Sequence, residues 1–350
     1  MRQQRESLSV CPRFFTQGRE AMRRQAAFSL ESTHRVKVLS VILCLLSLAG
    51  LAPTSRAAIE HTLERSFIVS AGGILKIDTI QGAIRVERSP DSQLHLLVGQ
   101  SMAVESEADA DRRLQDLDLQ IEQTGSQVSV KARYRRAAHW FWQNWPPVAL
   151  RYLIKVPRAC SLDLVTAEGD ISVGSLQGTL LARTGNGAIF AGEITGSVQA
   201  TSTRGDVAVT ACTGELTLIA KAGNVLVGRA GGLTRISGVG GTIEVQRARG
   251  NLHVEGDNAD LKIGFEYSLT ESAELHTSGG DIEAVFDPRS ACTISARASA
   301  FGAVKSKNLP LKVEAGKVGS SRAIATLNNG GPKILIDASG GNVRLNGSEP

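Results

Sequence analysis

Apolar residues alternate with polar or small ones along short segments between Leu162 and Gly264, and glycines separate these segments. This alternation is typical of β-strands, because successive side chains of a strand point to opposite faces. The glycines form two series that each step by eighteen residues and are offset by nine: Gly169, Gly187, Gly205, Gly223, Gly241 and Gly178, Gly196, Gly214, Gly232, Gly250. A fixed period of this size indicates repeated units that stack on their neighbours.

Superposing the repeats by eighteen residues gives four aliphatic columns. In one half they are Leu162, Leu180, Val198, Leu216, Thr234, Leu252 and Leu164, Ala182, Ala200, Leu218, Ile236, Val254. In the other half they are Ile171, Ile189, Val207, Val225, Ile243, Leu261 and Val173, Ala191, Val209, Val227, Val245, Ile263. The pattern predicts an all-β fold: a parallel β-helix or β-solenoid with an 18-residue coil and two main sheets. Its hydrogen bonds would run from coil to coil at roughly 4.8 Å per coil.

The corners between strands are expected at the glycines, because a chain that turns in so few residues visits positive φ or brings backbones too close for a Cβ. Asp170, Asp206 and Asn224 each follow a corner glycine. We expect their side chains to bond the backbone of their own turn.

Outside residues 162–264 the residue types and alternation typical of strands continue, but without the strict eighteen-residue period. Residues 58–160 are predicted to form a first coil and a mixed strand and short-helix cap that covers the open strand edge. Its elements are a coil at Ile74–Glu87, a strand at Leu94–Val98, a helix near Glu105–Leu117 capped by Ser106, and a hairpin of Asp118–Gln123 with Gln127–Arg133 turning at Gly125. Residues 161–347 are predicted to form the solenoid, continuous with the cap as one elongated domain.

Two further coil-like segments follow the strict repeats, at Ala273–Phe286 and Lys333–Leu345. The stretch between Phe286 and Gly331 carries no period that would place it in the fold.

Residues 1–57 read as an N-terminal extension and a secretory signal peptide. An apolar run of fifteen residues, Val38–Ala52, follows basic residues and precedes the small-residue site Ser55–Ala57. The run is shorter than the ~20 residues of a membrane span, so we predict cleavage after Ala57 and no membrane span afterwards; an uncleaved anchor is the alternative. Translation starts at Met1 or Met22. The expected location is the periplasm or the cell surface, in association with the outer membrane.

Charge gives no argument for nucleic acid as a partner. The chain has 39 Lys and Arg against 34 acidic residues, of which nine and three lie in residues 1–57. The remainder is therefore close to neutral, and no basic patch is indicated.

The three cysteines after residue 57 are interpreted as core side chains. Cys212 continues the apolar column Leu176, Ile194, Ala230 and Ala248, and Cys160 and Cys292 share the inward parity of their strands. Burial as small hydrophobic groups explains all three more simply than a redox or metal role.

The repeat does not explain the segment 139–147, HWFWQNWPP, which contains all three tryptophans. It plugs the end of the solenoid or covers an apolar outer face, such as that of Phe190 and Leu226, or else it is an exposed platform for a glycan, a lipid interface or a partner protein. In the second reading the binding residues are Trp140, Phe141, Trp142 and Trp145.

No catalytic residue, metal site or cofactor is predicted. Enzymes on parallel β-helices need paired carboxylates or clustered acids beside a basic residue, whereas the outward columns are mostly Thr, Ser, Gly and small apolar residues. The best cluster is Arg235, His253 and Glu255 on adjacent coils, and a solvated charge group explains it. The nonapeptide GGxGxD runs of calcium-binding rolls do not occur.

The run from Arg151 to Gly178, RYLIKVPRACSLDLVTAEGDISVGSLQG, resembles the entry to the bacterial putative-adhesin family of β-strand repeat proteins. The residues that carry the resemblance are Val156, Pro157, Gly169, Asp170 and Ile171, with a closing coil at Asn329–Leu345 that contains Gly330, Gly331, Gly340, Gly341 and Asn342. The resemblance covers roughly residues 65–346. It implies an envelope or surface protein of β-helical fold, and it supplies no catalytic residues.

Two functions are therefore weighed. The first is a non-enzymatic, exported structural or adhesin-like binding module of the bacterial cell envelope, with a glycan or an envelope protein as partner. The second is a carbohydrate-active enzyme, a polysaccharide lyase or hydrolase, on the same scaffold. The first is preferred because the outward columns lack a catalytic constellation.

Overall fold

The computed structural model describes residues 58–135, 147–249, 251–309, 312–315 and 319–348, all within the compact unit Arg56–Pro350. This part of the chain is all-β, with two 14-stranded mixed sheets and the single helix α3 (Glu107–Gln115). The predicted signal peptide and the aromatic segment Trp140–Trp145 lie outside the described residues, so both stay predictions.

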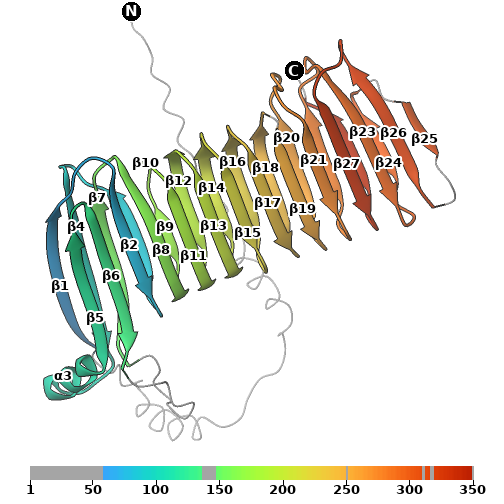
Figure 1. Cartoon of the computed structure of the whole chain (residues 1–350). Coiled ribbons are helices and arrows are strands. Elements are labelled where there is room, and N and C mark those ends of the chain that lie inside the picture. The colour runs from blue at the N-terminus through green and yellow to red at the C-terminus, as the bar shows by residue number, and fades with distance from the viewer. Residues whose placement is uncertain (1–57, 136–146, 250, 310–311, 316–318, 349–350) are drawn as a thin grey trace, which may run out of the picture. The chain divides into compact units, whose positions relative to one another are not determined.

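Sheet A contains, in spatial order, β1 (Ile59–Ile68), β4 (Gln93–Met102), β7 (Ala149–Val156), β3 (Ala83–Arg88), β9 (Ile171–Val173), β12 (Ile189–Thr195), β14 (Val207–Cys212), β16 (Val225–Ala230), β18 (Thr242–Ala248), β20 (Asp260–Phe265), β22 (Ile282–Phe286), β28 (Val343–Gly347) and β24 (Val304–Lys307), with β10 (Leu176–Gln177) also beside β12. Sheet B contains β5 (Leu117–Thr124), β6 (Gln127–Tyr134), β2 (Gly73–Thr79), β8 (Cys160–Glu168), β11 (Leu180–Asn186), β13 (Val198–Arg204), β15 (Leu216–Ala220), β17 (Thr234–Val239), β19 (Leu252–Asp257), β21 (Ala273–Thr277), β27 (Lys333–Ser339), β23 (Cys292–Ser299), β26 (Ser321–Leu327) and β25 (Lys312–Ala315). Figure 1 shows the strands of sheet B side by side in this order.

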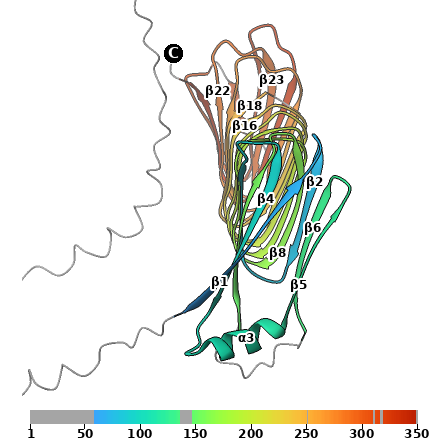
Figure 2. The ribbon, with the colours of Figure 1, turned by 90° about the vertical axis from the view of Figure 1, so that its left-hand side faces the viewer.

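The predicted 18-residue register is confirmed between β8 and β20. Leu180 pairs with both Leu162 and Val198 in parallel strands of sheet B, and the equivalent residues of sheet A pair in the same way. Between β11 and β20 consecutive strands alternate between the two sheets, so each eighteen-residue repeat contributes one strand to each sheet; β9 and β10 both lie in sheet A (Figure 2). After β20 the pairing offset grows, because Leu252 pairs with Ala273 and Leu261 with Ile282.

The core lies between the two sheets, as the aliphatic columns predict. Column members such as Leu180, Val207 and Leu218 are fully buried, and Thr234 is buried with its hydroxyl donating to the Gly232 carbonyl at 3.0 Å. The three cysteines are buried free thiols, which confirms their reading as core residues. Burial raises the pKa of Cys160 and Cys292 to about 11 each, so neither is a ready thiolate nucleophile at neutral pH.

The corner glycines allow the coils to stack closely. Gly205 has φ +135°, and a Cβ built on it would lie 2.2 Å from the carbonyl oxygen of Gly187, one coil away. No side chain fits in this position, because neither the backbone conformation nor the spacing accepts a Cβ.

The polar residues that follow the corner glycines form different hydrogen bonds from those predicted from the sequence. Asp170 and Asp206 do not bond their own turns: each accepts a hydrogen bond through Oδ1 from the backbone N–H eighteen residues later, at 2.8 Å from Ala188 and 2.7 Å from Asn224. Asn224 continues the ladder to Thr242 at 2.9 Å. These side chains therefore join adjacent coils, because the stacked coil presents its N–H groups nearer than the residue's own turn does.

The elements predicted for the N-terminal region all form. The coil of β2 and β3 buries Leu75 and Ile84, and Ser106 caps α3 by accepting from the Asp109 N–H at 3.2 Å. The hairpin is β5 with β6, and it turns at Gly125 with φ +59°. These elements continue both sheets, with antiparallel pairs at the margin.

Coil order is exchanged at both ends of the sheets. At the N-terminal end β2 lies between β8 and β6, and β3 lies between β9 and β7, so the first coil of the chain is covered by a later one. At the other end β27 and β28 insert between β21 and β22 on one side and β23 and β24 on the other. Each end coil of the chain is thus held between two other coils.

Candidate binding groove on the outer face of sheet B

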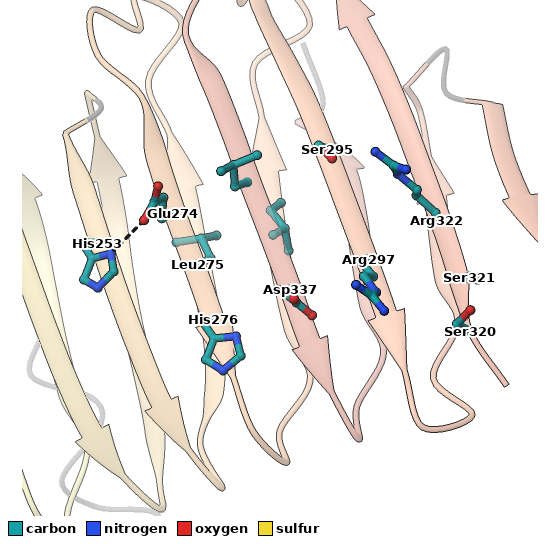
Figure 3. A pocket seen from close by; sticks show the side chains of 12 residues that line it. His253, Glu274, Leu275, His276, Ser295, Arg297, Ser320, Ser321, Arg322 and Asp337 are labelled. Atoms are coloured by element: carbon teal, nitrogen blue, oxygen red, sulfur yellow. Dashed lines mark ion pairs between the residues drawn. The ribbon is translucent and has the colours of Figure 1, made fainter. Parts of the chain in front are cut away.

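The exchanged coil order builds a groove on the outer face of sheet B across β19, β21, β27, β23 and β26. Its volume is about 670 Å³. Two rows of outward side chains cross these strands in register. The first row is His253, Glu274, Leu335, Ser295 and Ile324. The second row is Glu255, His276, Asp337, Arg297 and Arg322. Figure 3 shows members of both rows on these strands.

The β19 end of the groove is an acid–histidine cluster. His253 lies between two carboxylates: its Nε2 is 3.0 Å from Glu255 Oε1, and its Nδ1 is 3.3 Å from Glu274 Oε2 (Figure 3). The side chains of Glu255 and Glu274 are 60% and 59% exposed, and that of His253 is 43% exposed. This end therefore carries negative charge when the imidazole is neutral.

The predicted trio of Arg235, His253 and Glu255 is only partly brought together. His253 and Glu255 meet, whereas Arg235 forms an ion pair with Glu215 at 2.6 Å. The sequence pattern missed Glu274, because it pairs with His253 at an offset of twenty-one residues rather than eighteen. A solvated charge group remains an adequate description of this cluster.

The opposite end of the groove is cationic. Arg297 and Arg322 stand directly opposite each other on the antiparallel strands β23 and β26, and both are exposed. Within the described residues no carboxylate lies in ion-pair range of either guanidinium. Like charges directly opposite in a strand pair destabilise it, so this arrangement costs stability.

Asp337 lies between the two ends, on β27, with its Oδ1 buried. Among the residues that the structure describes, this oxygen has no hydrogen-bond partner. A buried acceptor that loses its water and gains no donor costs about 1–3 kcal/mol. The groove thus places an unsatisfied acceptor beside Arg297, and neither Arg297 nor Arg322 has an ion-pair partner within the described residues.

No metal site emerges from the described side chains, since no group of three His, Cys, Asp or Glu could hold an ion there. Over the same residues, no helix has the length and apolar character needed to cross a membrane. On sheet A the predicted apolar outer face is real: Phe190 and Leu226 are 49% and 41% exposed.

No family model matches the chain, and no curated protein matches it. Solved proteins with a similar fold include putative adhesins. One from Bacteroides fragilis is 12% identical with a TM-score of 0.41, over 82% of this chain and 97% of that one. A putative adhesin from Parabacteroides distasonis is 10% identical with a TM-score of 0.38, over 82% and 97%. A putative lipid binding protein from the same species is 9% identical with a TM-score of 0.37, over 81% and 96%. Two of these structures carry the name putative adhesin, which is also the name of the family that the sequence resembles.

Proposed function

We propose that this chain is a non-enzymatic, exported parallel β-solenoid that acts as an adhesin-like binding module of the bacterial cell envelope, in the periplasm or at the cell surface. In this proposal residues 1–57 direct export, residues 58–160 form the first coil and cap, and residues 161–347 form the solenoid. The partner is a glycan or an envelope protein, and the ligand site is the groove on sheet B.

The groove is the observation that carries this proposal. It crosses five strands, and charged and hydroxyl side chains line it together with Leu275, Leu335 and Ile336. Open grooves lined by hydrogen-bonding groups with some apolar surface suit extended polar ligands. The exposed side chain of Leu335 supplies apolar surface in the middle of the rows.

A filling variant tests the site. Ser295 points outward in the centre of the groove, so Ser295→Trp should close it without disturbing the core. We expect the purified full chain to bind members of a glycan array, and this variant to lose that binding. Ser237→Trp is the matched control, because Ser237 is an outward residue of β17 that does not line the groove.

Three results would count against the proposal. They are no binding to any glycan or envelope extract, equal binding by both tryptophan variants, and release of new reducing ends or unsaturated products from a polysaccharide panel. The last would replace the binding module by the lyase or hydrolase considered above.

One observation favours a hydrolase as the second candidate. On the outer face of sheet A, Ser66 Oγ lies 2.9 Å from His95 Nδ1, and His95 Nε2 lies 3.0 Å from Asp91 Oδ2. Hydrogen bonds from Ser89, the Gln93 N–H and His95 lower the pKa of Asp91 to about 2. An ionised Asp91 accepts the Nε2–H, which leaves the Nδ1 lone pair facing the serine hydroxyl.

This chain of groups has the order of a serine nucleophile, a base and an orienting acid, with the two ring nitrogens exchanged relative to the familiar triad. A hollow of about 250 Å³ beside it is lined by His95, Leu97, Leu153 and Lys155 among others. A fluorophosphonate probe followed by peptide mapping tests it. Labelling of Ser66 that Ser66→Ala and His95→Ala abolish, and that Thr62→Ala on the same strand face leaves intact, would establish this second function. An unlabelled Ser66 removes it.

A further inference from the structure

The facing arginines of the groove indicate the chemistry of its ligand. Directly opposed residues in an antiparallel pair have Cβ atoms about 5 Å apart. Both guanidinium groups can therefore reach one anionic group, and each can donate two parallel hydrogen bonds to it. Elsewhere on sheet B, Arg133 and Arg235 each have a carboxylate partner, whereas Arg183 and Arg204 have none among the described residues. Arg297 and Arg322 have none among the described residues, so their charge is available to a ligand.

Asp337, beside Arg297, further restricts the chemical groups that the ligand must carry. Asp337 pairs in register with Arg297 on the side away from Arg322, and its Oδ1 is the buried acceptor without a partner. A ligand that contacts all three side chains needs an acidic group and, one strand spacing of about 4.8 Å away, a hydroxyl or amide N–H. An acidic sugar provides this combination, because a hydroxyl group not directly adjacent to its acid group lies at about this distance from it.

The far end of the groove excludes one class of ligand. Glu255 and Glu274 flank His253 there, three and two strands from Arg297 respectively. A polymer that carries a negative charge on every unit would place some of its charges against these carboxylates, which repel them. The arrangement suits a chain with isolated acidic groups among neutral sugars.

We propose that the Arg297–Arg322 pair binds the carboxylate or sulfate of an acidic sugar within a mostly neutral glycan, and that Asp337 accepts a hydrogen bond from the same or the adjacent sugar. This inference rests on the proposed function, because it names the ligand class of that groove. It makes Arg297 and Arg322 specificity-determining residues, and it places the neutral part of the glycan over Leu335 and the histidine end.

The experiment uses two oligosaccharides that differ in one group, a neutral chain with a single terminal uronic acid and the same chain with the corresponding neutral hexose. Calorimetric titration of the full chain should show tighter binding of the acidic one. We expect Arg297→Ala and Arg322→Ala to weaken that binding by about 10- to 100-fold each, because a charge-assisted hydrogen bond is lost. The Lys variants should keep the preference for acid but bind more weakly, since an ammonium group cannot make the bidentate contact.

Arg183→Ala is the matched control: Arg183 is an exposed arginine on the same face of sheet B, outside the groove. It should leave both affinities unchanged. A fully sulfated oligosaccharide should bind no better than the singly charged one, and added salt should reduce the preference for acid.

Equal affinity for the two oligosaccharides, or an acid preference that survives in the double alanine variant, overturns this inference. If neutral glycans still bind and Ser295→Trp still abolishes that binding, the proposed function stands without it. Binding of anionic lipid vesicles but of neither oligosaccharide, lost in the double alanine variant, would reject the glycan as the ligand. If no glycan binds to the groove at all, both proposals fail.

Discussion

The coils of residues 162–264 and the last coils of the chain consist of strands with the same alternation of buried and exposed residues, yet their outer surfaces differ. In the first region space follows sequence, and every strand pairs with the strand eighteen residues away. In the last region β27 and β28 insert between strands that precede them in the chain. This insertion brings residues from His253 to Asp337 into two adjacent rows. Regular stacking supplies a uniform core, and the groove arises where the order of the coils is exchanged.

The two regions should differ most in how their folding responds to the deletion of a coil. Removal of residues 199–216 takes out one full period, so strands of like parity still meet and the chain should fold with a modestly lower Tm. Removal of 199–207 takes out half a period and sets sheet A strands against sheet B strands. Corner glycines and apolar columns then no longer coincide, and we expect no cooperative melt by circular dichroism. Equal collapse of both variants would contradict the register.

The same deletion at the end of the chain should behave differently. Removal of residues 333–350 takes away β27, the strand that joins β23 to β21. We expect the middle coils to remain folded while residues 287–332 become sensitive to limited proteolysis. Protection of that segment in the shortened chain would show that the exchanged coil order is not what holds the end together.

The next largest expected effect is on the free energy of unfolding, when one glycine from each of two regions is replaced by alanine. Gly205→Ala would put a Cβ 2.2 Å from the Gly187 carbonyl oxygen at φ +135°, so overpacking and backbone strain together should cost about 3–5 kcal/mol. Gly125→Ala lies in the β5–β6 turn with φ +59° and nothing within 4 Å of the new Cβ. It should cost about 1 kcal/mol. Urea unfolding of the two variants measures both values, and similar losses would mean that the stacked corner can relax.

The regular coils were readable from the sequence because every determinant is local. Alternation gives the strand faces, the glycine spacing gives the register, and Ser106 followed by acidic residues gives the start of α3. Even the burial of Cys212 follows from its column. These rules act within one coil or between neighbours at a fixed offset, so a single chain displays them.

The groove could not be predicted, for the complementary reason. All coils share the same alternation, so nothing in Lys333–Leu345 reveals that it inserts between earlier strands. The unplaced stretch between Phe286 and Gly331 forms β23 to β26, which carry Arg297 and Arg322. The predicted hydrogen-bond partners of the corner acids were wrong for the same reason. A rule for one turn assigned Asp170 and Asp206 to their own backbone, whereas stacking offers them the N–H groups of the next coil.

The smallest expected effect is a loss of stability in acid. It comes from the hydrogen bonds that join the corner side chains to the backbone of the adjacent coil. In the last region Asp281 Oδ1 accepts from the Asn342 backbone N–H at 2.8 Å and from its Nδ2 at 3.1 Å. These bonds, led by the backbone one and aided by Arg344, lower the pKa of Asp281 below its usual value of 3.8. A lowered carboxyl pKa stabilises the fold above the unfolded pKa, and this contribution disappears as pH falls through the folded pKa. The window is therefore below about pH 4.

Asp281→Asn keeps an acceptor oxygen but does not titrate, so it should flatten the loss of stability below about pH 4 and cost at most about 1 kcal/mol at neutral pH. Asn224 offers a second test in the middle coils, where its Oδ1 accepts from the Thr242 N–H. Asn224→Asp should also flatten the acid limb and lower stability at neutral pH, because its carboxylate replaces the Nδ2 donor that contacts Asp206 Oδ1 at 3.2 Å, and two neighbouring carboxylates raise each other's pKa. Urea midpoints between pH 2 and pH 7 measure both effects. Unchanged acid limbs in the two variants would mean that the ladder acts through geometry alone, in the middle coils and at the end alike.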